Sequence, residues 1–224
     1  MYPTQRFFAL ISGLKQPTVN KWVHKLLPYL ETALGHKNVV PQRPKMCRME
    51  DLSKHCPELI FCLDATERPI NRPSCSKKQK EFYSGKKKIH TVKRSVVISQ
   101  KSQRIVLLGH PSEGKKHDIK LYRDDSFAFP RGSYLYADSG YEGIQKDDDL
   151  IRTFTPRKKS KKKPLSFTDK SYNRLLSSQR IGVENAIGGM KRSKISGLKW
   201  RGRRDNFEDQ SNLIAAALYN LNLK

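Results

Sequence analysis

The stretch SFTDKSYNRLLSSQRIGVENAIGGMKRSK, residues 166–194, predicts one long helix from about Thr168 to Lys194. Ser166 suits the N-cap, and Asp169 three residues later completes a capping-box pattern that satisfies the first free backbone N–H groups. Apolar side chains recur along it at near-helical spacing and predict a face that packs on a core: Leu175, Leu176, Val183, Ile187 and Met190. The rest of the fold is expected to form around this helix.

A second stripe on the same helix carries charge. Arg180, Glu184 and Lys191 are four and seven residues apart, and at 100° per residue they lie within roughly 40° of one another. Such a stripe is typical of a surface ion-pair ladder that contributes little to stability. Whether Glu184 does more depends on what the rest of the chain places beside it.

Charge sets this chain apart from an ordinary globular protein. Its 224 residues include 45 Lys and Arg against 21 Asp and Glu, a formal net charge of +24. This balance implies a polyanionic partner, most commonly nucleic acid. An acidic membrane surface is the alternative, but no long basic amphipathic helix, transmembrane stretch or signal peptide is evident. We therefore expect no membrane partner and a location in the cytosol or beside the chromosome.

The four cysteines are Cys47, Cys56, Cys62 and Cys75, and none forms a C-x-x-C pair. A zinc site is a weak interpretation, even with His55 beside Cys56. Reduced, partly buried thiols are expected instead.

Residues 1–38 predict two short helices around a tight turn, the first from about Thr4 to Ile11 and the second with Pro17 in its first turn. The second helix has an expected apolar face of Val19, Trp22, Val23, Leu26 and Leu27. Its expected exposed face comprises Thr18, Asn20, Lys21, His24 and Lys25. This pattern is typical of a helix-turn-helix whose second helix enters the major groove of DNA, although an ordinary helical hairpin explains it nearly as well. Two helices are too few to close a core, so either a third is missing or the pair packs on the main domain.

Residues 39–57 carry three prolines and mixed charges and are interpreted as a linker. Residues 58–224 then predict a mixed α/β domain whose first strand is the apolar run Leu59–Leu63, which ends at Asp64. A run that is apolar on both faces suits a central, buried strand. Further strands are expected at His90–Ser99, Arg104–Leu108, Tyr134–Ala137 and Ile151–Phe154, with a helix at His117–Asp124 and a final helix opened by a second capping box, Asp205 and Glu208.

Three basic stretches punctuate this domain. One comprises Lys86, Lys87 and Lys88; residues 157–163 hold six cations in seven residues, and residues 191–204 hold seven cations and no acid. A charge run is usually a solvated loop. Three of them in one small protein suggest a path for a phosphate backbone.

Two acids, Asp64 and Asp138, end predicted buried strands, and Glu184 lies on the helix expected to cover the sheet. Charges at such positions are costly unless they pair or bind a cation. If the two strands are neighbours, a divalent cation would relieve the repulsion, and oxygen ligands favour Mg²⁺ or Mn²⁺. Two such ions about 3.5–4 Å apart support phosphodiester cleavage. Asp118 is an alternative second ligand, although a His-Asp pair that opens a helix more often serves capping and packing.

Several motifs, taken together, resemble bacterial insertion-sequence transposases of the DDE class, in the IS-four/IS-five branch with its Harbinger-like relatives. They cover nearly the whole chain in order. They are DATERPI (64–70), Arg72-Pro73, FYSGKKK (82–88) with His90-Thr91, Gly114 with His117-Asp118, DSGY (138–141), Arg180 to Lys191, and Leu218-Tyr219-Asn220.

The resemblance implies a ribonuclease-H-like fold in which Asp64, Asp138 and Glu184 hold two Mg²⁺ or Mn²⁺ ions. Arg180 and Lys191 match the signature R-x-x-x-E-x-x-x-x-x-x-K of the branch, where both are thought to position DNA phosphates. The branch often has Tyr three residues before this Arg, where Ser177 stands here. Relatives usually carry more N-terminal sequence, so the chain resembles an N-terminally truncated member.

The expected protein is therefore a bacterial DNA transposase that acts in the cytoplasm at the nucleoid. It would cut double-stranded transposon ends and join them to target DNA, and synapsis of two ends implies a homodimer or a larger assembly. The expected DNA contacts are Thr18, Asn20, Lys21, Lys25, Lys86, Lys87, Lys88, Arg180 and Lys191. The rivals are a catalytically inactive or truncated derivative that binds DNA without cutting it and, more remotely, an RNA-binding protein.

Overall fold

A central strand, β1 (Ile60–Pro69), organises the sheet in this computed structural model, which describes residues 3–159, 164–202, 204 and 206–223. β1 pairs antiparallel with β3 (Ile89–Ser99) and parallel with β6 (Tyr134–Ala137). The remaining strands join these: β7 (Arg152–Phe154) pairs with β6, and β2 (Tyr83–Ser84), β4 (Ile105–Leu108) and β5 (Ser112–Glu113) pair with β3. The mixed α/β class predicted from the sequence is confirmed.

The prediction that the first strand ends at Asp64 is wrong. The strand continues to Pro69 because β3 pairs with it along nearly its whole length, down to Pro69 opposite Thr91. β6 pairs with β1 only as far as Leu63, opposite Ala137. Asp64 therefore lies inside a strand, at the point where its parallel neighbour stops.

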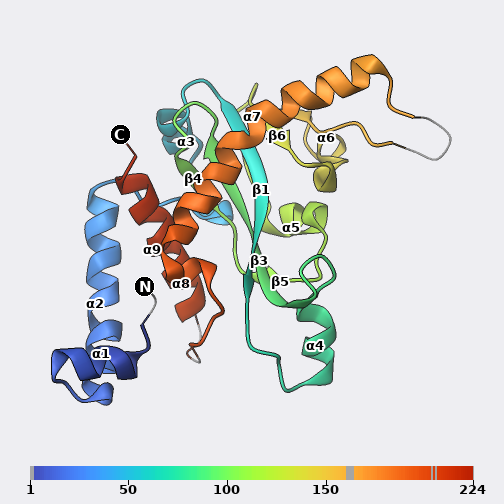
Figure 1. Cartoon of the computed structure of the whole chain (residues 1–224). Coiled ribbons are helices and arrows are strands. Elements are labelled where there is room, and N and C mark those ends of the chain that lie inside the picture. Colours follow the sequence, from blue (N-terminus) through green and yellow to red (C-terminus); the bar gives the residue numbers. More distant parts are fainter. Residues whose placement is uncertain (1–2, 160–163, 203, 205, 224) are drawn as a thin grey trace.

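Alternate residues of β1 face two separate apolar cores. Phe61 and Leu63 join the core that includes α3 (Met49–His55), α5 (Asp118–Asp125) and α6 (Ile144–Asp147). Cys62 joins the core formed with α7 (Phe167–Arg192) and α9 (Phe207–Leu221). Figure 1 shows α7 crossing one face of the sheet, with α9 beside it. Short segments complete the fold: η1 (Pro44–Met46), α4 (Ser76–Phe82), η2 (Ser139–Tyr141) and α8 (Lys194–Gly197).

The long helix α7 forms where its sequence predicts it. Ser166 accepts from the backbone N–H of Asp169, and Asp169 accepts from the N–H of Ser166, so both halves of the capping box are present. The helix ends at Arg192, two residues before the predicted end, and α8 follows directly. Gly189 lets α7 approach α9, because a Cβ there would lie 2.4 Å from the Tyr219 ring.

Ion pairs anchor the final helix α9. Its N-cap is Asn206, which makes no side-chain cap hydrogen bond, and Asp205 lies outside the described residues. The predicted partner in that box, Glu208, instead bonds the buried Arg94 guanidinium, and Asp209 bonds both Arg94 (2.7 Å) and Arg43 (2.7 Å). Among the described residues, both carboxylates are therefore paired with arginines of the main domain.

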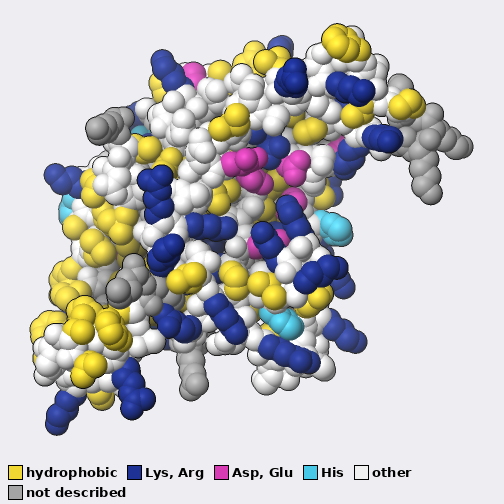
Figure 2. All heavy atoms as spheres, viewed as in Figure 1, with side chains coloured by type: hydrophobic (Ala, Val, Ile, Leu, Met, Phe, Trp, Pro, Cys, Tyr) yellow, Lys and Arg dark blue, Asp and Glu magenta, His cyan; other side chains and the backbone are white. Residues whose placement is uncertain are grey.

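The N-terminal helices α1 (Gln5–Ser12) and α2 (Gln16–His36) form the predicted pair. α2 packs Leu34 and Leu27 toward α9, and this contact holds the pair against the main domain. Trp22 and Leu26, predicted to belong to the buried face, are about half exposed (47% and 53%), because the contact with α9 is made by Leu27 and Leu34, which lie roughly 100° around the helix from them. Figure 2 shows apolar side chains gathered at its lower left, where α1 and the start of α2 lie in Figure 1.

Residues 39–57, predicted as a linker, pack closely on the main domain. Gln42 forms a β-bridge with Leu107, and Leu52 of α3 is fully buried in the core. Cys56 is also buried, which raises the pKa of its thiol to about 12. All four cysteines carry free thiols, as predicted. Within the described residues, no helix is both long enough and apolar enough to cross a bilayer.

Candidate active site

Two acids lie side by side at the edge where β6 ends. β1 and β6 are parallel neighbours with Leu63 opposite Ala137, so the next residues, Asp64 and Asp138, are adjacent across strands about 4.8 Å apart. Because Leu63 and Ala137 both face the α5 core, the residues after them face α7. Backbone N–H groups hold one oxygen of each acid: Ala65 donates to Asp64 (2.7 Å) and Ser139 to Asp138 (2.6 Å).

The electrostatics of Asp64 show that these acids share one environment. Burial is the main cause that raises its pKa above the ordinary value, and the charges of Asp138 and Asp118 raise it further. The Ala65 N–H and the Arg180 guanidinium act in the opposite direction. A carboxylate held this way gains from any cation that approaches it.

The charged stripe of α7 lies over these acids. Arg180 Nη1 is 3.7 Å from Asp138 Oδ1, and its buried Nε has no hydrogen-bond partner among the described residues. Further along the helix, Lys191 Nζ donates to the backbone oxygen of Glu67 on β1 (3.4 Å). Burial is the main cause that lowers the pKa of Lys191, with Lys87 acting the same way, while Glu67 and Asp64 oppose the shift. The stripe is therefore more than a surface ladder.

Glu184 lies between these two cations on the helix. Cys62 Sγ bonds the carbonyl of Gln179 (3.3 Å), and Lys191 reaches Glu67, so α7 follows β1 over this span. Five residues of helix advance about 7.5 Å and two residues of strand about 6.6 Å, so the backbone of Glu184 lies level with Asp64. Its side chain is exposed. Figure 2 shows acidic side chains grouped near the crossing of α7 and β1, with Lys and Arg around them.

The donors present fit a hard divalent cation only in part. Asp64 and Asp138 offer adjacent carboxylate oxygens, the ligand type that Mg²⁺ and Mn²⁺ prefer. Among the described residues, no three His, Cys, Asp or Glu side chains converge closely enough to hold a metal ion. A third ligand would have to come from a side chain that turns inward, and the exposed Glu184 has the freedom to do so.

The alternative ligand Asp118 has a different set of contacts. Its Oδ1 accepts from Lys93 Nζ (3.0 Å), which also lies 3.7 Å from Glu67 Oε1. Its Oδ2 approaches Gly140 so closely that a Cβ there would be 2.6 Å away. Asp118 therefore supports the turn after Asp138, and its Coulombic effect on Asp64 makes it a neighbour of the site.

The comparisons with known proteins bear on what these acids do. A family model described as a transposase DDE domain matches residues 55–221. The chain is also 36% identical over 222 residues to a protein described as a probable transposase for insertion sequence element IS702, from Microchaete diplosiphon, with 99% of this chain and 76% of that protein covered. The chain belongs to the DDE transposase family. No solved structure gives a significant match.

The basic residues of this transposase divide between the site and the rest of the surface. Lys86, Lys87 and Lys88 are exposed in the turn between β2 and β3, and the charge of Lys87 helps to lower the pKa of Lys191. In the stretch 157–163, Arg157 pairs with Asp169 and Lys158 with Glu142, while residues 160–163 lie outside the described part. In the stretch 191–204, Arg203 lies outside it too.

The N-terminal residues predicted to contact DNA differ in exposure. Lys21 and Lys25 are exposed on α2, and Lys25 lies over the Trp22 ring. Thr18 and Asn20 are partly buried, and Asn20 donates to Gln5 Oε1 of α1 (2.9 Å). Lys21 and Lys25 thus remain free to meet a phosphate, whereas Asn20 joins the two helices.

Sequence reasoning missed several residues that support this site. Lys93 bridges Glu67 and Asp118, and the fully buried Tyr141 hydroxyl has no partner among the described residues. Burial, with Asp118 and Asp64 next, raises the pKa of Tyr141 well above its ordinary value. The signal that could have found Lys93 is a cation within the predicted strand His90–Ser99, since a charge in a sheet that helices cover needs a partner.

Asp64→Asn is expected to stabilise the metal-free protein at pH 7 by on the order of 1 kcal/mol, or about 2–4 °C in Tm. Because folding raises the pKa of Asp64, ionisation opposes folding above the ordinary value of 3.8, and the advantage of Asn should shrink as the pH falls toward that value. Thermal denaturation in a chelating buffer at pH 7 and pH 4 measures it. An equal or lower Tm for the variant at pH 7 would contradict this description of Asp64.

Proposed function

We propose that this transposase cuts phosphodiester bonds at the ends of an insertion sequence and joins the freed 3′-hydroxyl to target DNA. Asp64, Asp138 and Glu184 would be its divalent-cation ligands, in a ribonuclease-H-like arrangement. The observation that carries the proposal is the parallel pairing of β1 with β6, which sets Asp64 beside Asp138 beneath the charged face of α7. Membership of the DDE transposase family supports it.

Two Mg²⁺ or Mn²⁺ ions, when bound, would lower the pKa of the attacking water and offset the charge on the leaving oxygen. Asp64 and Asp138 would hold them from the sheet, and Glu184 would complete the set from α7. Arg180, now 3.7 Å from Asp138, would turn to a DNA phosphate once a cation takes its place beside that acid. Lys191 and Lys87 would bind the backbone on the other side of the site.

The partners follow from the same surface. Double-stranded transposon ends and target DNA would lie across the turn 86–88 and the α7 stripe. The α1–α2 pair would act as a helix-turn-helix segment, with Lys21 and Lys25 toward DNA. Synapsis of two ends would need a homodimer or a larger assembly, working in the bacterial cytoplasm at the nucleoid.

A second candidate is a derivative that binds DNA without cutting it, and the exposed Glu184 is the observation that favours it. Duplex DNA that carries the terminal repeats of the element, incubated with and without Mg²⁺, separates the two. Strand cleavage that requires Mg²⁺ supports the transposase. A complex on a native gel with no cleavage at any Mg²⁺ or Mn²⁺ concentration supports the derivative.

The affinity for duplex DNA should fall steeply with salt. If the basic residues beside the site neutralise six phosphates, log affinity should fall with log salt at a slope of about −5, since each contact contributes about 0.9. Fluorescence anisotropy between 50 and 200 mM salt measures the slope. A nearly flat dependence would show that these cations face water.

A further inference from the structure

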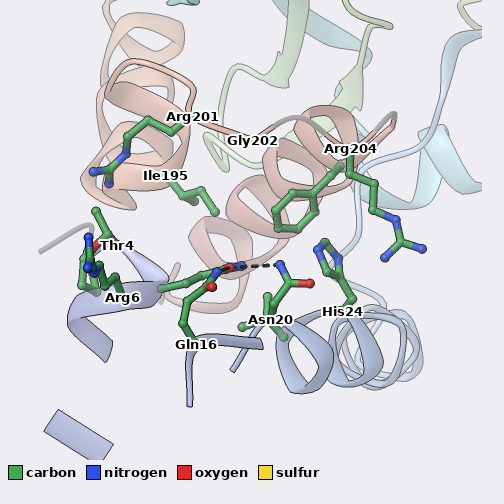
Figure 3. Close-up of a pocket in the computed structure, with 13 residues that line it drawn as sticks. Thr4, Arg6, Gln16, Asn20, His24, Ile195, Arg201, Gly202 and Arg204 are labelled. Atoms are coloured by element: carbon green, nitrogen blue, oxygen red, sulfur yellow. Dashed lines mark hydrogen bonds between the residues drawn. The ribbon is translucent and has the colours of Figure 1, made fainter. Parts of the chain in front are cut away.

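A cleft lies between the N-terminal helices and the segment that joins α8 to α9. Its volume is about 710 Å³, and Figure 3 shows its two walls. Arg6 and Asn20 lie on the side of α1 and α2, and Ile195 and Arg204 lie on the facing side. The cleft is lined by none of the acids of the site, and neither the family match nor the proposed reaction gives it a role.

The chemistry of the cleft matches a nucleotide strand. Arg6 and Arg204 supply charge for phosphates, and none of the described residues that line the cleft is acidic. Val23, Ile195 and Phe207 supply apolar surface for base faces. The side-chain amides of Gln5, Gln16 and Asn20 bond one another through Gln5 Oε1, and their remaining groups supply donors and acceptors for base edges. Groups that suit phosphates, base faces and base edges are thus present in one cleft.

The size of the cleft selects an unpaired strand over a duplex. A hollow of 710 Å³ is equivalent to a sphere roughly 11 Å across, within the usual range for ligand sites. A B-DNA duplex is wider than its major groove, which is itself about 12 Å wide, so a duplex does not fit inside the cleft. Paired bases would also present neither their faces nor their pairing edges to the cleft walls.

The cleft is connected to the active site through the chain. The backbone N–H of Trp200, which precedes the cleft residues Arg201 and Gly202, donates to the carbonyl of Pro69 at the end of β1 (2.8 Å). Asp64 lies five residues before Pro69, about 17 Å along the strand. A strand leaving the acids could therefore reach the cleft within a few nucleotides, past Lys191 and Lys87.

We infer that this cleft binds an unpaired DNA strand, held through its phosphates by Arg6 and Arg204. This inference rests on the proposed function for the source of that strand, because cleavage beside a duplex end lets the cut strand separate. Burial and then the positive charge of Arg204 lower the pKa of His24, which also lines the cleft.

The test compares binding of a dye-labelled 12-nucleotide single strand and its duplex by fluorescence anisotropy at fixed salt. Arg6→Gln/Arg204→Gln should weaken single-strand binding at least about 10-fold and reduce the magnitude of its salt slope by about 1.4, two contacts at about 0.7 each. Ile195→Trp, which fills the cleft without changing charge, should also weaken it. Duplex affinity should change less than threefold in both proteins.

The matched control is Lys101→Gln/Arg131→Gln, which removes two exposed charges outside the cleft. If the control weakens single-strand binding as much as the cleft variant does, or if Ile195→Trp has no effect, the inference is wrong. Mg²⁺-dependent cleavage of duplex ends by the same variants is scored separately. Retained cleavage with unchanged single-strand binding would overturn the cleft alone and leave the proposed function standing.

Discussion

Glu184→Gln is expected to reduce Mg²⁺-dependent strand cleavage by a factor on the order of 10³ while duplex affinity stays within about twofold. The backbone of Glu184 lies level with Asp64, on the helix face whose Arg180 already contacts Asp138. Loss of one negative charge removes a cation ligand and leaves the phosphate-binding cations unchanged. Cleavage of end-labelled duplex and anisotropy on the same preparation give the two numbers.

Glu50→Gln serves as the matched control, because it makes the same change on an exposed residue of α3. It should cut at the wild-type rate. Undiminished cleavage by Glu184→Gln would remove this residue from the active site. A parallel loss of DNA affinity and folding would make its role structural.

Arg94→Met is expected to destabilise the protein by about 3–5 kcal/mol, the range for removing one partner of a buried ion pair. The Arg94 side chain is 3% exposed, donates to Asp209 (2.7 Å) and pairs with Glu208. Its loss leaves Glu208 with the longer contact to Arg68 (3.5 Å) and Asp209 with Arg43 alone of its two arginines. At about 2–4 °C per kcal/mol, Tm should fall by roughly 6–20 °C. Thermal or denaturant unfolding measures this loss of stability. The element whose contacts with the sheet are weakened is α9.

Arg123→Met is the control for this effect. Arg123 also pairs with an acid, Asp147 (2.9 Å), but its side chain is 53% exposed, so the pair should contribute under about 1 kcal/mol. If the two variants lose similar stability, the prediction that burial makes the Arg94 ion pairs more important than the exposed Arg123 pair is wrong. Arg94→Met should also leave the cleavage rate of the still-folded fraction nearly unchanged, because Arg94 contacts neither Asp64 nor Asp138 in the described interactions.

Local signals in the sequence predicted individual elements well. The Ser166 box and the apolar periodicity located α7, and the short run Tyr134–Ala137 matched β6 residue for residue. The two acids could be proposed as a pair because each follows an apolar run. Their adjacency depends on β1 and β6 being parallel neighbours, and no local pattern carries that information.

The errors share one cause, which is pairing between residues distant in the chain. An apolar run indicates only which residues are buried, so the predicted first strand ended at Asp64. Backbone hydrogen bonds with β3 continue the observed strand β1 to Pro69. A carboxylate near the start of a helix predicts a cap, but Glu208 pairs with Arg94, which lies 114 residues earlier in the chain. The exposure of the Glu184 side chain could not be predicted either, because helical spacing predicts the face on which a residue lies and not its rotamer.

The central claim is that Asp64, Asp138 and Glu184 share divalent cations, and counting bound Mn²⁺ by electron paramagnetic resonance tests it most directly. Wild-type protein with its end DNA should bind two Mn²⁺ per active site. Asp64→Asn, Asp138→Asn and Glu184→Gln should each lose at least one ion or bind it at least about 10-fold more weakly. Unchanged stoichiometry and affinity in all three variants would contradict the claim.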